Sequence, residues 1–407
     1  MTPINKLAKE TDRLLVGMVF LAILIGIAAI YSSTSHSESE YLRKMYQRQI
    51  LWGIFALLML WMIIEIPQRL IHDFAYLIFG IDILALILVL FVGEEAMGAR
   101  RWFKFGPFSL QPSEISKLGV VFALARYLSQ KHLNCNRPKN LIIPLGMVGV
   151  PFLLILRQPD LGTAVVFVAL LFPLMYWAGL EPINLFFLIS PLLSGFCTFS
   201  PVVLLLYWAF VVVVLYLSRP GFAKTLTIAF VNFAVGGAVP MIWERLHDYQ
   251  KQRIITFLNP GSDPYGAGYQ IIQSKIAIGS GGLTGKGFLH GTQTKLAFLP
   301  ERHTDFIFPV IGEEWGFLGA LCVLTLFFLI IWRGLKIASS VKVPFSSLMA
   351  VGLTAILALH VFINIGMTVG LMPVTGLPLP FISYGGSSLV MNVILVGLLL
   401  NIGRRRS

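Results

Sequence analysis

Residues Leu14-Leu-Val-Gly-Met-Val-Phe-Leu-Ala-Ile-Leu-Ile-Gly-Ile-Ala-Ala-Ile-Tyr-Ser32 form a stretch without a single charged side chain. A helix rises about 1.5 Å per residue, so about 20 such residues span the hydrocarbon core of a bilayer. Further apolar runs follow at 48–66, 74–93, 114–130, 141–157, 162–180, 184–199, 201–218, 224–243, 305–332, 346–371 and 380–402. The sequence therefore predicts an all-α, polytopic membrane protein, a bundle of about 10–12 transmembrane helices.

The composition agrees with this fold class. Apolar residues make up 57% of the chain and charged residues 12%, which excludes a single soluble domain. We expect residues 1–407 to form one integral membrane domain with a large extracytoplasmic loop over 244–304. No cleavage site follows the first apolar run, so we expect it to remain as an anchor. The three cysteines (Cys135, Cys197 and Cys322) indicate no disulfide framework.

The distribution of Lys and Arg predicts the orientation. Both ends of the chain are basic, and an even number of spans places them on the same side of the membrane. We therefore expect a multi-pass protein of the cytoplasmic (inner) membrane with both termini in the cytoplasm. The loop over 244–304 would then carry much positive charge outward. A long loop escapes the positive-inside rule and can attract anionic headgroups, and a phosphate-bearing ligand on the outer face is the alternative explanation.

One carboxylate marks the boundary of that loop. Asp305 lies in Pro300-Glu-Arg-His-Thr-Asp-Phe-Ile-Phe308, where the polar stretch meets the apolar run that reaches about Trp332. An ionisable group at the mouth of a transmembrane helix is costly unless it faces water, a cavity or a charged partner. Asp305 is therefore the first candidate for a functional residue, with Arg302 and His303 beside it.

A second outer segment combines basic, aromatic and acidic residues. Arg100, Arg101 and Trp102 precede Gln111-Pro-Ser-Glu114 and Lys117. Arginines grip phosphate oxygens bidentately, although a tryptophan here is more often an interfacial belt residue. Glu114 and Lys117 are three residues apart on one helix face, and this spacing alone favours an ordinary ion pair.

Three other polar segments have ordinary explanations as well as functional ones. Asp160, in Arg157-Gln-Pro-Asp-Leu-Gly-Thr163, is placed to cap the following helix. Gly279–Gly287 lacks the spacing of a phosphate-binding P-loop, and His247, His290 and His303 lack metal-ligand spacing. Pro373–Ser388 breaks the helical pattern before the last span, so it is a candidate cavity wall.

These segments resemble a known family. Gln111–Glu114, Pro300–Phe308 and Pro378–Ser388 look like the signature regions of the SEDS (shape, elongation, division, sporulation) cell-wall polymerases. Gln273–Gly282, Lys286–Thr292 and Glu301–Asp305 resemble the elongation (RodA-like) branch more than the division branch. The chain departs from the family between about Gly179 and Asp248, where it has three apolar runs instead of one. We therefore expect two extra spans within 181–243.

The resemblance implies a peptidoglycan glycosyltransferase that polymerises lipid II on the outer membrane face during elongation of rod-shaped cells. Asp305 would be the general base of an inverting reaction, and undecaprenyl diphosphate would leave. Arg100, Arg101 and Lys117 would contact the diphosphate, and Glu114 would orient Lys117 or the sugar. The remaining expected substrate contacts are Trp102, Gln111, Arg302, His303 and Ser383.

The resemblance also implies partners. These are a class B penicillin-binding protein with transpeptidase activity, the elongation machinery and membrane lipid, but no nucleic acid. A divalent cation (Mg or Mn) could share the diphosphate charge, although the sequence shows no dedicated cage for it. Two alternatives remain open, a lipid II flippase and a non-catalytic scaffold for the penicillin-binding protein. A scaffold would tolerate loss of Asp305, and a polymerase would not.

Overall fold

A computed structural model describes residues 12–96, 99–105, 108–245, 248–264, 266, 268–296 and 298–404 of the 407-residue chain. Its long helices are α2 (Arg13–Ser35), α4 (Met45–Ile64), α5 (Gln68–Val92), α6 (Pro112–Leu128), α7 (Ile142–Arg157), α8 (Leu161–Trp177), α9 (Pro182–Cys197), α10 (Pro201–Ser218), α11 (Phe222–Arg245), α15 (Ile307–Ser340), α16 (Pro344–Thr368) and α17 (Gly386–Arg404). Each expected apolar run corresponds to one of these helices.

Nine helical segments in the described part of the chain are long and apolar enough to cross a membrane, and α8 and α9 are shorter apolar helices. The helix α6 belongs to neither group: it is 17 residues long, and Glu114, Lys117 and Arg126 interrupt its apolar sequence. The chain is a multi-pass membrane protein. The basic residues Lys6, Lys9, Arg405 and Arg406, which support the expected orientation of the termini, lie outside the described residues.

Local sequence explains where several helices begin. Pro112, Pro182, Pro201 and Pro344 are the first residues of α6, α9, α10 and α16. A proline is suited to this position because its missing N–H has no partner within the helix there. The side chain of Asp12 caps α2 by accepting a hydrogen bond from the backbone N–H of Leu15 at 3.2 Å.

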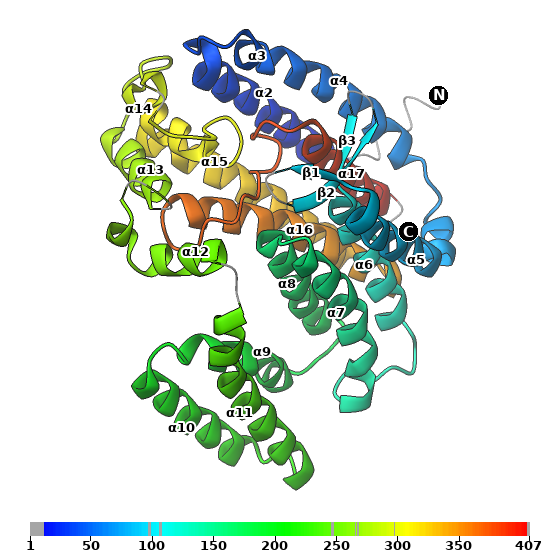
Figure 1. Ribbon diagram of the computed structural model, residues 1–407. Coiled ribbons are helices and arrows are strands. Elements are labelled where there is room, and N and C mark those ends of the chain that lie inside the picture. Colours follow the sequence, from blue (N-terminus) through cyan, green and yellow to red (C-terminus); the bar gives the residue numbers. More distant parts are fainter. Residues whose placement is uncertain are drawn as a thin grey trace.

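The centre of the bundle is α16, the most buried of the nine candidate spans. It packs against α6, α8, α15 and α17, while α17 also packs against α4 (Figure 1). Close approach of the backbone fixes part of this packing. A Cβ at Gly352 of α16 would lie 2.5 Å from Val121 of α6, and one at Gly334 of α15 would lie 2.3 Å from Thr354 of α16.

The segment between α5 and α6 contains the strands β1 (Glu94–Ala96), β2 (Ala99–Phe105) and β3 (Phe108–Leu110). They pair antiparallel in the order β1-β2-β3. The sheet is confined to this segment, and the all-α fold class expected from the sequence is confirmed for the described residues. The alternation of Arg100, Trp102 and Lys104 with Arg101 and Phe103 fits a strand, which exposes every second side chain on one face.

The expected outer loop over 244–304 contains short helices of its own. These are α12 (Asp248–Leu258), η2 (Pro260–Ser262), α13 (Tyr269–Ser280) and α14 (Thr292–Lys295). The loop packs onto the start of α15, where Gly316 (φ 67°) kinks the helix. Backbone N–H groups of Lys286 and Gly287 donate to the carbonyls of Glu313 and Glu314, both at 3.0 Å. The glycine-rich segment Gly279–Gly287 thus packs against α15 and is held there by backbone hydrogen bonds.

The last span begins later than the sequence predicted. Residues 380–385 are not helical, and α17 starts at Gly386. Phe381 has a positive φ of 64°, which a helix cannot accommodate. Side chains satisfy the irregular backbone instead, since Gln49 donates to the carbonyl of Ser383 at 3.2 Å and accepts from the N–H of Gly385 at 3.3 Å.

The region 181–243 forms the three helices α9, α10 and α11, as its three apolar runs predict. They stand apart from the main bundle at the lower edge of Figure 1, and α9 contacts α8. Hydrogen bonds between helices hold the three together. Asn232 of α11 donates to Ser190 of α9 at 2.8 Å, and Trp208 of α10 donates to Ser194 of α9 at 2.9 Å.

Candidate active site

Asp305 lies in a turn directly before α15, whose N-cap is Phe306. Its side chain is half-buried at the helix N-terminus, where the helix dipole favours a negative charge. The backbone carbonyl of Asp305 accepts a hydrogen bond from the side-chain amide of Asn364 on α16 at 2.9 Å. A Cβ at Gly376 would lie 3.4 Å from the Asp305 carboxylate, so the segment between α16 and α17 faces this group.

That segment, residues 369–385, forms one wall beside Asp305. Asn364 donates to the carbonyl of Leu377 at 2.7 Å as well as to that of Asp305. Ser383 accepts from the N–H of Leu379 at 2.8 Å and donates to the carbonyl of Thr304 at 2.6 Å. Ser383 is buried, and its hydroxyl joins the wall to the turn that carries Asp305. The irregular backbone expected for Pro373–Ser388 is therefore satisfied within the protein, as membrane depth requires.

Arg302 and His303 precede Asp305 in the same turn. Arg302 donates through Nε to the carbonyl of Ser33 at the end of α2, at 2.7 Å. Burial lowers the pKa of the Arg302 guanidinium from its ordinary value. Burial also lowers the pKa of His303; Glu301 opposes this effect and Arg302 reinforces it. His303 is therefore neutral at neutral pH.

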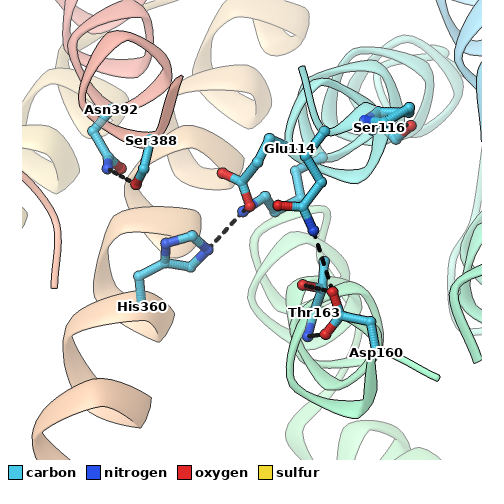
Figure 2. Close-up of polar contacts among 10 residues, drawn as sticks. Glu114, Ser116, Asp160, Thr163, His360, Ser388 and Asn392 are labelled. Carbon is cyan, nitrogen blue, oxygen red and sulfur yellow. Dashed lines mark hydrogen bonds and ion pairs between the residues drawn. The ribbon is translucent and has the colours of Figure 1, made fainter. Parts of the chain in front are cut away.

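Glu114 and Lys117 form the ion pair that their spacing indicates. The Lys117 ammonium lies 2.7 Å from Glu114 Oε1 and 2.8 Å from Nε2 of His360 on α16 (Figure 2). All three side chains are buried. An ammonium only donates hydrogen bonds, so Nε2 of His360 accepts and the proton of this neutral ring is on Nδ1. Among the described residues, Nδ1 has no hydrogen-bond partner.

A small cavity adjoins this cluster. Its volume of about 10 Å³ is close to the minimum that holds one water molecule. The lining includes Glu114, Lys117 and His360, together with Asn392 of α17. Asn392 donates to Ser388 at 3.3 Å, and Figure 2 shows both residues across from Glu114. The cavity thus places a polar, buried pocket between α6, α16 and α17.

Gln111 and Asp160 connect α6 to α8. Gln111 donates to Asp160 Oδ2 at 3.3 Å, and the same oxygen accepts from the hydroxyl of Thr163 at 2.9 Å (Figure 2). Asp160 Oδ1 accepts from the backbone N–H of Thr163 at 3.1 Å, which confirms that Asp160 caps α8. A Cβ at Gly162 would lie 2.7 Å from the carbonyl of Thr375, so this turn contacts the wall beside Asp305.

The neighbouring residues Arg100 and Arg101 on β2 make different contacts. Arg101 donates to the carbonyls of Gln158 at 2.8 Å and Pro159 at 2.6 Å, so its guanidinium fixes the turn before α8. Arg100 is exposed and donates to the carbonyl of Phe91 at 3.4 Å. Trp102 is half-buried. The more exposed Arg100 is therefore better placed than Arg101 to meet a ligand.

The structure joins the two predicted groups of residues through α16. His360 contacts Lys117, and Asn364, one helical turn later, contacts Asp305. Neither His360 nor Asn364 was a candidate from the sequence. The available signal was the presence of two polar side chains, four residues apart, within an apolar span.

No group of three His, Cys, Asp or Glu side chains able to hold a metal ion exists in the described parts of the chain. His247 lies outside them. The carboxylate of Glu114 is also engaged by Lys117. The donor set of the described residues therefore does not fit a dedicated metal cage.

Comparisons with known proteins identify the family to which the chain is similar. Residues 12–407 match the sequence model of the FtsW, RodA and SpoVE family, described as cell cycle proteins. The chain is 40% identical over 390 residues to the peptidoglycan glycosyltransferase MrdB of Escherichia coli K12, covering 96% of this chain and 92% of MrdB. It is 36% identical to the peptidoglycan glycosyltransferase RodA of Treponema pallidum, covering 98% of each chain.

Two solved structures resemble the whole chain. A chain from a peptidoglycan synthase complex, described as coordinating polymerization and crosslinking, superposes with a TM-score of 0.73 at 32% identity, covering 97% of this chain and 98% of that one. The rod shape determining protein RodA of Thermus thermophilus superposes with a TM-score of 0.65 at 27% identity, covering 97% of both chains.

Proposed function

This chain belongs to the FtsW, RodA and SpoVE family, and we propose that it polymerises lipid II into glycan strands with Asp305 as the general base. The family resemblance found in the sequence is thus confirmed. The chain is a peptidoglycan glycosyltransferase, the activity for which its relatives in Escherichia coli and Treponema pallidum are named. The observation that supports the role of Asp305 is its place at the N-terminus of α15, half-buried and facing the wall at Gly376.

The reaction needs one base. The 4-hydroxyl of one sugar attacks the anomeric carbon of another, so a new C–O bond forms as the bond to undecaprenyl diphosphate breaks. The hydroxyl proton passes to the carboxylate of Asp305, and the attack inverts the anomeric centre. Because the diphosphate leaves as an anion, it needs no proton from a general acid, unlike the alcohol that leaves in glycoside hydrolysis. One carboxylate therefore suffices.

Positive charge near the leaving group would assist the bond cleavage. Arg302 is adjacent to the base and uses Nε to hold Ser33, which leaves its other N–H groups for diphosphate oxygens. Arg100, exposed on β2, is the second candidate. Lys117 is buried between Glu114 and His360, so it would reach a diphosphate only through the small cavity beside them. We therefore propose that the buried residues Lys117 and Glu114 support the shape of the site from inside the protein.

The remaining predicted residues would position the site. Ser383 holds the turn of Asp305 against the wall, and Gln111 holds Asp160 at the start of α8. Arg101 fixes the turn that precedes Asp160. Trp102, on β2, would pack against the sugar or the lipid chain. The roles of Ser383, Gln111 and Arg101 rest on these contacts, and that of Trp102 rests on its half-buried position on β2.

We further propose that the protein acts in cell elongation together with a class B penicillin-binding protein. The support is the match to a chain from a peptidoglycan synthase complex and the resemblance to RodA. Both termini would lie in the cytoplasm and Asp305 at the outer face of the inner membrane. This orientation follows from the charge distribution in the sequence.

The test is polymerisation of purified lipid II by the full-length protein with its penicillin-binding partner. We expect Asp305→Asn to lower the rate by about 10²–10⁴-fold, the usual contribution of a general base. Glu301→Gln is the matched control, since it removes the same charge from an exposed residue of the same turn and should keep most activity. Equal rates for Asp305→Asn and wild type would remove Asp305 from the mechanism. Absence of product from wild type would favour a flippase or a scaffold.

A further inference from the structure

A large, partly open cavity lies where α9 and α11 approach the main bundle. It is lined by the first turns of α7, α9 and α11 and the second half of α8, and its volume is about 860 Å³. Its wall is largely apolar and includes Leu145, Leu171, Phe172, Leu188, Phe222 and Val231. The volume lies within the range of about 300–1,000 Å³ that is typical of ligand pockets. This cavity is separate from the site described above.

One end of the cavity is polar. Lys224 of α11 donates to Asn184 Oδ1 at 2.5 Å, and the amide of Asn184 donates to Asn136 Oδ1 at 2.7 Å. All three residues line the cavity. An ammonium has three N–H donors, and Asn184 accepts from one of them. The lysine can therefore donate to a second acceptor inside the cavity.

Basic residues stand next to several lining residues in the chain. Arg137 and Lys139 are exposed on either side of the lining residue Pro138, and Arg219 is exposed directly before the lining residue Pro220. The acidic side chain nearby, Glu181, accepts from the amide of Asn184 at 3.3 Å. Three exposed basic residues and Glu181 thus lie next to lining residues in the chain, a balance that favours an anion over a cation or a neutral headgroup.

We propose that this cavity binds one anionic phospholipid, with the acyl chains along the apolar wall and the phosphate at Lys224. A free phosphate would leave the apolar wall without an occupant. A lipid fills both parts, and the helices α7, α9 and α11 that line the cavity also carry exposed apolar side chains on their outer surfaces. The lipid would also fill the gap between α8 and the pair α9 and α11, and so would hold these helices against the main bundle.

Native mass spectrometry of the purified full-length protein tests this site. The probes are phosphatidylglycerol and phosphatidylcholine with identical acyl chains, offered at equal concentration. We expect wild type to retain phosphatidylglycerol about fivefold better, the contribution of one basic residue near a membrane surface. Lys224→Gln should lose this preference and Lys224→Arg should keep it. Lys342→Gln is the matched control, because Lys342 is exposed at the same end of the bundle outside the cavity.

A second variant tests the cavity without changing charge. Val231→Trp fills it from α11, so both lipids should be lost although Lys224 remains. Equal retention of the two lipids by wild type, an unchanged preference in Lys224→Gln, or full retention in Val231→Trp would each overturn the proposal. Displacement of phosphatidylglycerol by inorganic phosphate alone would show a site for a free anion instead, and would also overturn it.

Discussion

The buried cluster of Glu114, Lys117 and His360 makes a quantitative prediction for Lys117→Met. Methionine keeps the length and the apolar stem of the lysine but removes the ammonium. Glu114 is a residue 9% exposed and His360 one 1% exposed, and the substitution leaves the carboxylate of Glu114 and Nε2 of His360 without the donor that both contact. The protein must then bury a charge without a partner.

Breaking a buried ion pair by removing one partner costs about 3–5 kcal/mol of unfolding free energy. In Glu114→Gln/Lys117→Met no charge remains, and the residual cost is that of polar groups without partners, about 1–3 kcal/mol. We therefore expect the double variant to be more stable than Lys117→Met alone, by about 2 kcal/mol. Lys104→Met is the control. Its ion pair with Glu94 has the similar length of 2.9 Å but is exposed, so the expected cost is about 0–1 kcal/mol.

The assay is equilibrium unfolding of the purified protein in mixed detergent micelles, with the four proteins compared under identical conditions. A cost below about 1 kcal/mol for Lys117→Met, equal to that of Lys104→Met, would mean that water screens the inner pair as it screens a surface pair. A double variant less stable than Lys117→Met would show that the two residues do not act as a pair. Either result would refute the description of this cluster as buried and coupled.

Three further predictions concern the turn and the kink around Asp305. Ser383→Ala removes the partner of the Leu379 N–H and the Thr304 carbonyl; it should cost about 1–3 kcal/mol in the same unfolding assay and lower the rate of glycan synthesis. Gly316→Ala should destabilise the protein by at least about 1–3 kcal/mol, because a Cβ at this positive φ would lie 2.3 Å from the backbone nitrogen of Gly285. The control Gly80→Ala should be neutral or stabilising, because a Cβ there would meet nothing within 4 Å. Burial lowers the pKa of His303, so below pH 6.5 the unfolded chain takes up a proton more readily than the folded protein. The contribution of His303 to the unfolding free energy should therefore be constant above pH 6.5 and fall as the pH drops below it. His303→Gln should show a flatter dependence of stability on pH.

Much of the candidate site was predictable because its signals are local. Asp305 stands out because a carboxylate meets a long apolar run, and the pairing of Glu114 with Lys117 follows from their spacing on a helix. The cap at Asp160 follows from its place before an apolar run. Each of these depends on residues within one or two turns of each other, so the chain itself brings them together.

The many membrane crossings can be read from the amino-acid sequence alone, because the length and apolarity of a segment decide whether it can span a bilayer. The contacts between side chains across the bundle become visible only in the folded protein. Lys117 contacts His360, 243 residues away, and Ser383 holds Thr304, 79 residues away. The physical reason is that a transmembrane helix is apolar on nearly all sides, so its sequence pattern does not show which face packs against a neighbour. The same reason hid the lipid-sized cavity at Lys224, which exists only through the placement of α7, α8, α9 and α11.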